Sequence, residues 1–375
     1  MPSPTATNDP THIWHALTGL SPTAPPTPRE SLAHRRILLT GAGGSIGSAL
    51  AHALAASNPA HLILLDTSEH SLYEIDRDLT TAIPHTAVLG SVTDHPLLDD
   101  LFLHHRPEIV FHAAAFKHVP LIEQNPFAAL ANNALGTHTL ALATARHHAN
   151  HLVLVSTDKA VDPHSLMGAS KRLAELALLS LGETSPTRVS IVRLGNVLGS
   201  HGSVLPLFLD QIARGLPLTV THPEARRYFL TLDQTVAALL DALETPAPPS
   251  SILVPELAPA IRILDLARHL LAEHTSPAKI LFTGLRPGDK LEESLISQRE
   301  HWLPSSDASP NPNLRVLTSP HPTANSLAET MHSLAEAVTH RDLAAALDLV
   351  LQLVPEYTPS PTLTHSIHPA EEARA

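Results

Sequence analysis

The chain has 375 residues, no cysteine and a formal net charge of −12, from 24 Lys and Arg against 36 Asp and Glu. This length allows a sizeable core, in one large α/β domain with a smaller lobe or in two modest domains. The acidic balance argues against nucleic acid as a partner, and the lack of cysteine excludes disulfides, thiolate catalysis and cysteine metal sites, which fits a reducing cytoplasm.

Histidine is abundant, with 27 residues, but none of them forms the HExxH spacing of a zinc site. Adjacent pairs such as His104 and His105 are typical of a solvated surface, and no metal site is predicted. The chain has no apolar run of about 18 residues and no basic, hydrophobic start. We therefore expect a soluble, cytoplasmic protein without a membrane span.

The first folded segment follows the proline-rich stretch Thr23–Ser31. The apolar run Ile37–Thr40 predicts a strand, the glycines after it predict a tight turn, and the alanine-rich sequence beyond predicts a helix. Apolar runs at 61–66, 86–94, 109–115, 151–157 and 188–197 predict further strands. Strands that alternate with helices in this way indicate a Rossmann-type, doubly wound α/β fold with a parallel sheet.

The same reading divides the chain into four regions. We predict an N-terminal extension at 1–34, a NAD-binding domain at 35–195, a smaller substrate-binding lobe at 196–304 that is partly interleaved with it, and a linker, helical segment and tail at 305–375. The strand–helix alternation weakens after residue 196, which sets that boundary. Apolar spacing in Ala324–Val354 predicts one or two amphipathic helices, for packing or for contact within an expected homo-oligomer.

The sequence TGAGGSIG places Gly41, Gly44 and Gly47 at the predicted strand-to-helix turn. Glycine allows the backbone to turn tightly and approach a pyrophosphate, and the start of the helix, at Ser45 and Ile46, offers free N–H groups to the phosphates. The pattern therefore predicts a dinucleotide site.

Other residues refine the cofactor prediction. Asp66 ends the next predicted strand, where a dinucleotide site places an acid for the adenosine ribose. Thr67 follows it rather than a cation, which favours NAD and leaves NADP possible. Asp94 is placed either to reach the adenine or as a loop acid without a ligand. Ala113 and Ala114 supply small side chains where the cofactor would lie on the sheet.

Between Arg35 and Glu293 the motifs follow one another in a specific order. They are TGAGGSIG, LLD, FHAAAFKHVP, NNALGT, STDKAV, MGASKRLAE, RLGNVLGSHGSVLPLF, RYFLT and RPGDKLEE. This combination resembles the extended short-chain dehydrogenases of polysaccharide biosynthesis, most closely their UDP-N-acetylglucosamine 4,6-dehydratases. The resemblance implies that NAD oxidises C4 of a UDP-sugar, water is eliminated across C5 and C6, and C6 is reduced.

The resemblance also implies roles for individual residues. Asp158 would protonate the departing C6 oxygen and Lys159 would abstract the C5 proton, which requires a protonated acid and a neutral amine. An ordinary loop ion pair is the alternative. Lys171 is expected to bind the nicotinamide ribose. Four residues earlier, where this superfamily usually has a tyrosine base, stands Met167, which has no proton to exchange.

Met167 is therefore interpreted as a shape and dielectric element of a Met-for-Tyr variant. The proton of the C4 hydroxyl then goes to Thr157 with a water relay to Lys171, or to a carboxylate such as Asp158 before it acts as an acid. We favour the relay. A decayed, inactive site is disfavoured because Lys159, Lys171 and the glycine turn are retained together.

Substrate contacts are expected from four polar side chains in the later motifs. Lys117 would contact the sugar or the diphosphate, and Asn196 the diphosphate. Arg227 and Arg286 carry forked guanidinium groups that suit phosphate oxygens, although arginines in such loops are often only solvated. Two other functions stay open at this point: a nucleotide-sugar 4-epimerase, which needs no elimination pair, and a non-catalytic protein that senses NAD.

Overall fold

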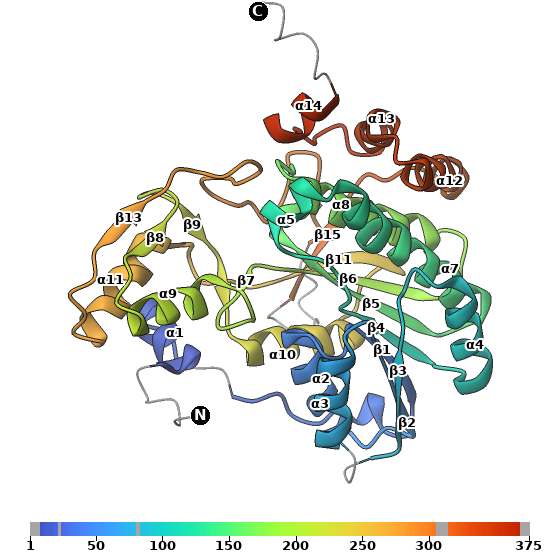
Figure 1. The fold of residues 1–375 in the computed structure, drawn as a ribbon. Helices are drawn as coiled ribbons and strands as arrows, with labels where there is room; N and C mark the ends of the chain where they lie inside the picture. The colour runs from blue at the N-terminus through green and yellow to red at the C-terminus, as the bar shows by residue number, and fades with distance from the viewer. Residues whose placement is uncertain (1–7, 22–23, 80–82, 305–313, 368–375) are drawn as a thin grey trace, which may run out of the picture.

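The computed structural model describes residues 8–21, 24–79, 83–304 and 314–367. Its central feature is a nine-stranded sheet in the order β14-β15-β11-β6-β5-β4-β1-β2-β3 (Figure 1). Strands β1 to β6 and β11 are parallel, whereas β15 pairs antiparallel with β11 and with β14. The order 3-2-1-4-5-6 within this sheet is that of a Rossmann fold. The predicted doubly wound fold is confirmed.

The strands agree closely with the apolar runs of the sequence. They are β1 (Arg36–Thr40), β2 (His61–Asp66), β3 (His85–Leu89), β4 (Ile109–His112), β5 (His151–Thr157), β6 (Arg188–Leu194), β11 (Ser250–Pro255), β14 (His301–Trp302) and β15 (Leu314–Thr318). The third and fourth strands are shorter than predicted, since β3 ends at Leu89 and β4 at His112.

Helices cover both faces of the sheet (Figure 1). One face packs against α2 (Ser45–Ala56), α3 (Glu69–Leu79) and α10 (Leu232–Glu244). The other face packs against α4 (His95–His105), α7 (Thr137–Arg146) and α8 (Leu166–Leu181). Successive strand residues point to opposite faces, so that Leu38 and Leu39 enter different cores, and for this reason the strands are apolar throughout.

A smaller lobe lies beside the sheet (Figure 1). Its elements are α1 (Pro10–Thr18), β7 (Asn196–Val197), α9 (Val204–Ala213), β8 (Leu218–Val220), β9 (Arg226–Arg227), β10 (Phe229–Leu230), β12 (Ile261–Arg262), α11 (Ile263–Glu273) and β13 (Ile280–Phe282). Ile13 and Trp14 of α1 share its core with Phe208 and Leu266, so part of the N-terminal segment belongs to this lobe.

Three helices follow the sheet: α12 (Ala324–His340), α13 (Leu343–Leu353) and α14 (Pro361–Ile367). The helices predicted between residues 324 and 354 are thus confirmed. Leu327, Met331 and Leu334 of α12 belong to the same buried cluster as α8. The proline-rich stretch 305–313 and the tail 368–375 lie outside the described residues. No helix of the described chain is long and apolar enough to cross a membrane.

A buried charge cluster connects α8 with the centre of the sheet. Arg193 of β6 has no exposed surface and donates to Glu175 on α8, with Nε 2.8 Å from Oε1 and Nη2 2.7 Å from Oε2. Its guanidinium also donates to both oxygens of Glu300 at 2.7 Å. Burial acts to raise the pKa of Glu175, but Arg193, Arg172 and the hydroxyl of Ser156 outweigh it and hold the pKa at about 2.

This cluster yields a test of stability. Arg193→Met leaves two buried carboxylates without their shared cation, so we expect the free energy of unfolding to fall by about 3–5 kcal/mol. Arg214→Met is the matched control, because Arg214 and Asp210 form a pair with side chains 65% and 56% exposed, and its loss should cost under about 1 kcal/mol. Chemical denaturation measures both, and equal losses would contradict the assigned role of the cluster.

Candidate active site

The turn between β1 and α2 accepts only glycine at two positions. Gly41 has a φ of 70°, and a Cβ there would lie 2.5 Å from the backbone nitrogen of Ala114. A Cβ on Gly47 would lie 1.9 Å from the carbonyl oxygen of Gly41. Gly44 is the N-cap of α2, which begins at Ser45, so the free N–H groups of the helix face this turn. The backbone therefore forms a cradle suited to a pyrophosphate.

A cavity of about 260 Å³ opens beside the glycine turn. Its walls include five of the predicted cofactor residues, namely Gly41, Gly44, Asp66, Ala113 and Ala114. The carboxylate of Asp66 accepts hydrogen bonds of 2.8 Å from the backbone nitrogens of Gly43 and Ser68, which fix it at the end of β2. A cradle without side chains and a fixed acid at the ribose position fit a dinucleotide.

The remaining predicted cofactor residues lie around this cavity. Ser45 Oγ accepts a hydrogen bond of 2.9 Å from the backbone nitrogen of His201, which brings the loop after β7 over the turn. Ile46 packs against the core beneath α2. Asp94 is exposed and caps α4, because its Oδ1 accepts from the backbone nitrogen of Leu97 at 3.1 Å. Its observed contact is thus that of a helix-capping acid.

Asp158 and Lys159 follow β5 directly, in a short 3₁₀ turn at Asp158–Ala160. Lys159 Nζ donates to Asp158 Oδ1 and to Asn196 Oδ1, both at 3.0 Å, and Thr157 Oγ1 donates to the same Asp158 oxygen at 3.0 Å. Asp158 is fully buried, and its Oδ2 has no hydrogen-bond partner among the described residues. Polar groups thus converge at the carboxyl edge of the sheet, where such folds bind ligands.

Lys171 and Met167 lie one turn apart on α8, which packs closely on the backbone of Lys159 at Gly168. Lys171 Nζ donates to the carbonyl oxygen of Val155 at 2.7 Å. Its side chain is almost completely buried, and burial lowers the pKa of Lys171 to about 8. The negative charge of Glu175 acts to raise this pKa but has the smaller effect. Met167 is also buried and belongs to the main core cluster. The thioether therefore contributes packing at the position where the sequence analysis expected a tyrosine base.

Glu293 is a member of the site that the sequence analysis missed. It is buried, and its carboxylate lies 3.8 Å from Lys159 Nζ, 3.3 Å from Lys290 Nζ and 3.9 Å from Arg227 Nε. Burial acts to raise the pKa of Glu293, but the three cations, with Lys159 first, outweigh it and lower the pKa. The signal for Glu293 in the sequence was the end of the motif RPGDKLEE.

Asn133 is a second residue that sequence reasoning missed. It lies in a π-helical turn, Leu130–Gly136, and such turns often mark functional sites. Its side-chain amide accepts from the backbone nitrogen of Phe116 at 2.8 Å, and donates to the carbonyl oxygen of Phe116 at 3.0 Å and to Ser170 Oγ at 3.1 Å. It therefore ties the loop after β4 to α8.

The predicted substrate contacts divide into two groups. Asn196 contacts Lys159, and Arg227 donates to the carbonyl oxygens of Arg226, Lys290 and Leu291 at 2.7–3.1 Å. These two side chains thus organise the site from within.

The other two contacts, Lys117 and Arg286, are exposed. Lys117 Nζ lies 3.4 Å from Ser200 Oγ, and Arg286 pairs with Asp289 at 2.9 Å. The pKa of His118 is lowered by burial first and then by the positive charges of Lys117 and Arg286. Both cations are therefore close enough to act on the same histidine. Across the described residues, no three His, Asp or Glu side chains gather as a metal site.

Comparison with known proteins now adds to this geometry. Residues 37–308 match the sequence pattern of the family described as "Polysaccharide biosynthesis protein". The chain belongs to this family.

Two curated proteins are similar in sequence to this chain. The "Probable polysaccharide biosynthesis protein EpsC" of Bacillus subtilis is 41% identical over 274 residues, 71% of this chain and 46% of the relative. The UDP-glucose 4-epimerase of Rickettsia typhi is 35% identical over 276 residues, 71% of this chain and 79% of the relative. The chain thus spans about half the length of EpsC.

Two solved structures share the fold of this chain. Pen from Bacillus thuringiensis superposes with a TM-score of 0.69 at 27% identity, covering 78% of this chain and 89% of Pen. A double mutant of DesIV, a dTDP-glucose 4,6-dehydratase from Streptomyces venezuelae, solved with NAD, gives a TM-score of 0.62 at 23% identity and covers 70% of this chain and 88% of DesIV. At that identity the second likeness shows the fold alone.

The glycine turn yields a second test. In Gly47→Ala the added methyl group collides with the Gly41 carbonyl and distorts the turn. Because overpacking costs roughly 1–3 kcal/mol, we expect NAD affinity to fall by about 5- to 150-fold. Gly215→Ala is the control, because Gly215 has a φ of 65° but no neighbour within 4 Å of its Cβ position. Calorimetric titration with NAD measures both variants. Unchanged NAD binding in Gly47→Ala would refute the assignment of the cradle.

Proposed function

We propose that this protein is an NAD-dependent UDP-N-acetylglucosamine 4,6-dehydratase, which makes a UDP-4-keto-6-deoxy-N-acetylhexosamine for surface polysaccharide biosynthesis. The observation that carries the proposal is the ion pair of the buried Asp158 with the partly buried Lys159 at the carboxyl end of β5. Membership of the polysaccharide biosynthesis family supports it, as do likenesses to nucleotide-sugar 4-epimerases and to a dTDP-glucose 4,6-dehydratase.

The glycine turn, Asp66, Ala113, Ala114 and Lys171 would hold the cofactor. When bound, NAD supplies the acceptor for the C4 hydride and the donor that returns it to C6. NAD is favoured over NADP because a 2′-phosphate would meet the fixed carboxylate of Asp66. None of the described residues that line the cavity is Lys or Arg, so no cation there would balance this repulsion.

The elimination needs a proton on Asp158 and none on Lys159. This state differs from the observed ion pair only in the position of one proton along a contact of 3.0 Å. In the elimination Asp158 gives its proton to the C6 oxygen, which leaves as water, and Lys159 takes the proton of C5. The pair is then the ion pair seen in the structure.

The rest of the cycle restores both groups. Lys159 returns a proton to C5 as C6 is reduced, which leaves a neutral amine beside the Asp158 carboxylate. The next C4 hydroxyl then delivers its proton to Asp158 while C4 is oxidised. The hydroxyl proton leaves in the water, so each turn of the cycle is balanced.

The contacts around Thr157 support Asp158 as the acceptor of the C4 proton, in place of the water relay favoured from the sequence. The hydroxyl of Thr157 already donates to Asp158 Oδ1, whereas Lys171 Nζ donates to the carbonyl of Val155. Thr157 would thus take the C4 proton as it passes its own to Asp158. Lys171 would keep the expected ribose contact, and Met167 would shape the pocket beside it.

Four polar residues would orient the reacting pair and the substrate. The amide oxygen of Asn196 and the carboxylate of Glu293 hold the amine of Lys159. Lys117 and Arg286, the two exposed cations, would meet the diphosphate. Glu293 thus links Lys159 to the segment that carries Arg286.

A 4-epimerase is the second candidate function. It is favoured by the Rickettsia typhi UDP-glucose 4-epimerase, which this chain matches over 79% of the length of that enzyme. An epimerase needs oxidation at C4 but no elimination, so the reaction would not use Asp158 and Lys159 as an acid–base pair. A non-catalytic protein that binds NAD is the third candidate and would leave the sugar unchanged.

The test is mass spectrometry of UDP-N-acetylglucosamine incubated with the purified protein and NAD. We expect a product lighter by one water, formed with NAD and not with NADP. Lys159→Ala and Asp158→Asn should each lower the rate by roughly 10²–10⁴-fold, because each removes one proton-transfer group. Lys279→Ala, which removes an exposed lysine, is the matched control and should retain full activity.

Other outcomes would assign the other functions. A product of unchanged mass with a different retention time indicates the epimerase, and an unchanged sugar despite bound NAD indicates the binding protein. Normal water loss by Lys159→Ala would remove that residue from the chemistry.

A further inference from the structure

The C-terminal part of the chain lies beyond the stretch that matches the family, which ends at residue 308. It nevertheless contacts α8, the helix that carries Met167 and Lys171 (Figure 1). We infer that the segment 354–363 positions this helix for catalysis, and that Ser360 is the positioning residue that acts through Glu123. The inference rests on the proposed function, in which Lys171 of α8 would bind the nicotinamide ribose and Met167 would shape the pocket beside it.

The first anchor is a buried carboxylate at the start of α8. Glu123, from α5 (Val119–Gln124), is 4% exposed, and its Oε1 accepts from the backbone nitrogen of Leu166 at 2.8 Å. Its other oxygen accepts a hydrogen bond from Ser360 Oγ. Leu166 is the first residue of α8, where a carboxylate also interacts favourably with the helix dipole. One side chain therefore joins the C-terminal segment to the N-terminus of the catalytic helix.

The backbone and the burial of this junction support the same conclusion. The nitrogen of Thr358 donates to the carbonyl oxygen of Pro163 at 2.9 Å, so the segment also holds the loop between β5 and α8. Burial raises the pKa of Glu123. The hydrogen bonds from Ser360 and Leu166 act to lower this pKa, but they do not outweigh the burial. A buried carboxylate with so few donors depends strongly on each of them.

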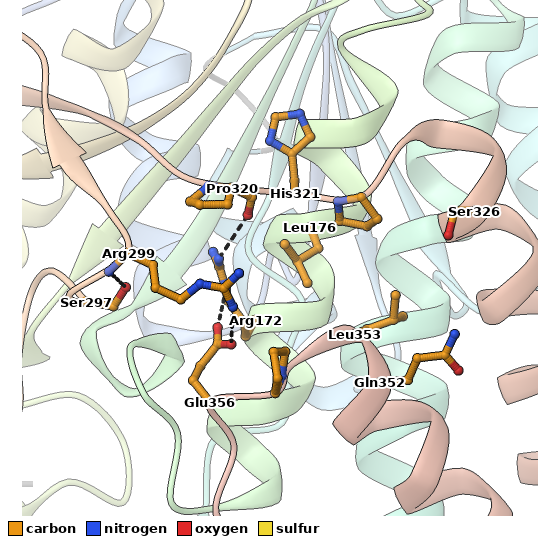
Figure 2. A pocket seen from close by; sticks show the side chains of 12 residues that line it. Arg172, Leu176, Ser297, Arg299, Pro320, His321, Ser326, Gln352, Leu353 and Glu356 are labelled. Atoms are coloured by element: carbon orange, nitrogen blue, oxygen red, sulfur yellow. Dashed lines mark hydrogen bonds and ion pairs between the residues drawn. The ribbon is translucent and has the colours of Figure 1, made fainter.

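The second anchor lies further along α8. Arg172, next to Lys171, has its Nε 3.3 Å from Glu356 Oε1 and donates from Nη2 to Ser319 Oγ at 2.8 Å. Figure 2 shows its guanidinium between Glu356 and Pro320, on the wall of a cavity of about 280 Å³ between α8 and the C-terminal part. The C-terminal part thus holds α8 at its first residue through Glu123, and one to two turns later through Arg172.

Displacement of the first turn of α8 would move Met167 and Lys171, and it would also disturb the backbone of Lys159, because a Cβ on Gly168 would lie 2.2 Å from the Lys159 carbonyl oxygen. Met167 follows Leu166, and Lys171 lies one turn further on. The loop around Gly288 packs on the same helix start, since a Cβ on Gly288 would lie 2.8 Å from the Cβ of Ser165, the N-cap of α8. The C-terminal segment therefore supports the point where the catalytic helix meets the loop that carries Arg286.

The test is steady-state kinetics of Ser360→Ala in the full chain. We expect kcat for water loss to fall on the order of tenfold, since small misplacements of reacting groups are costly. KM for UDP-N-acetylglucosamine and bound NAD should stay near those of wild type, and the melting temperature should fall by only a few degrees, so that the variant stays folded at the assay temperature. Ser360→Thr, which keeps the hydroxyl, should restore kcat. Thr364→Ala is the control, because that hydroxyl contacts only the carbonyl oxygens of Ser360 and Pro361 in the described chain.

Two results would overturn the inference. One is a kcat for Ser360→Ala within twofold of wild type. The other is a loss of activity that merely follows a lowered melting temperature and is not rescued by Ser360→Thr. If wild type loses no water from the sugar, the proposed function fails and this inference with it; an active wild type with an unaffected Ser360→Ala refutes the inference alone.

Discussion

The buried carboxylate of Glu175 is the contact on which the arrangement of the site depends. It accepts hydrogen bonds from Ser156 on β5, from Arg193 on β6 and from Arg172 on its own helix. Ser156 directly precedes the loop with Asp158 and Lys159, and Glu175 lies one turn beyond Lys171. Because every member of this cluster is paired in a low-dielectric interior, the cluster fixes α8 against the sheet.

With α8 fixed in this way, the proposed elimination would need only proton transfers between the substrate and the pair of Asp158 and Lys159. In the proposed elimination one proton starts on Asp158, and the reaction ends with Asp158 and Lys159 in the ion pair that the structure shows. Asn196 and Glu293 both come from segments after β6, so the second half of the chain completes a pair that the first half supplies. In the proposed mechanism the hydrogen bond from Thr157 to Asp158 supplies a path for the proton in place of the usual tyrosine.

Local patterns predicted the strands, the glycine turn and the adjacency of Asp158 and Lys159, because period and short-range spacing are encoded within a few residues. The sequence could not predict contacts between distant segments. Glu293 reaches Lys159, and Ser360 reaches Glu123, only through the folding of the small lobe and the C-terminal part. The contact of Asn196 with Lys159 was not predicted for the same reason, and its expected role at the diphosphate stays a prediction.

The central claim is that one active site oxidises C4, eliminates water and reduces C6 with the same hydride. Its most direct test uses UDP-N-acetylglucosamine with deuterium on C4, and locates the label in the product by NMR. The account predicts that the deuterium appears in the C6 methyl group of a 4-keto sugar. Deuterium that is still on C4, in a sugar that keeps its C6 hydroxyl, would contradict it.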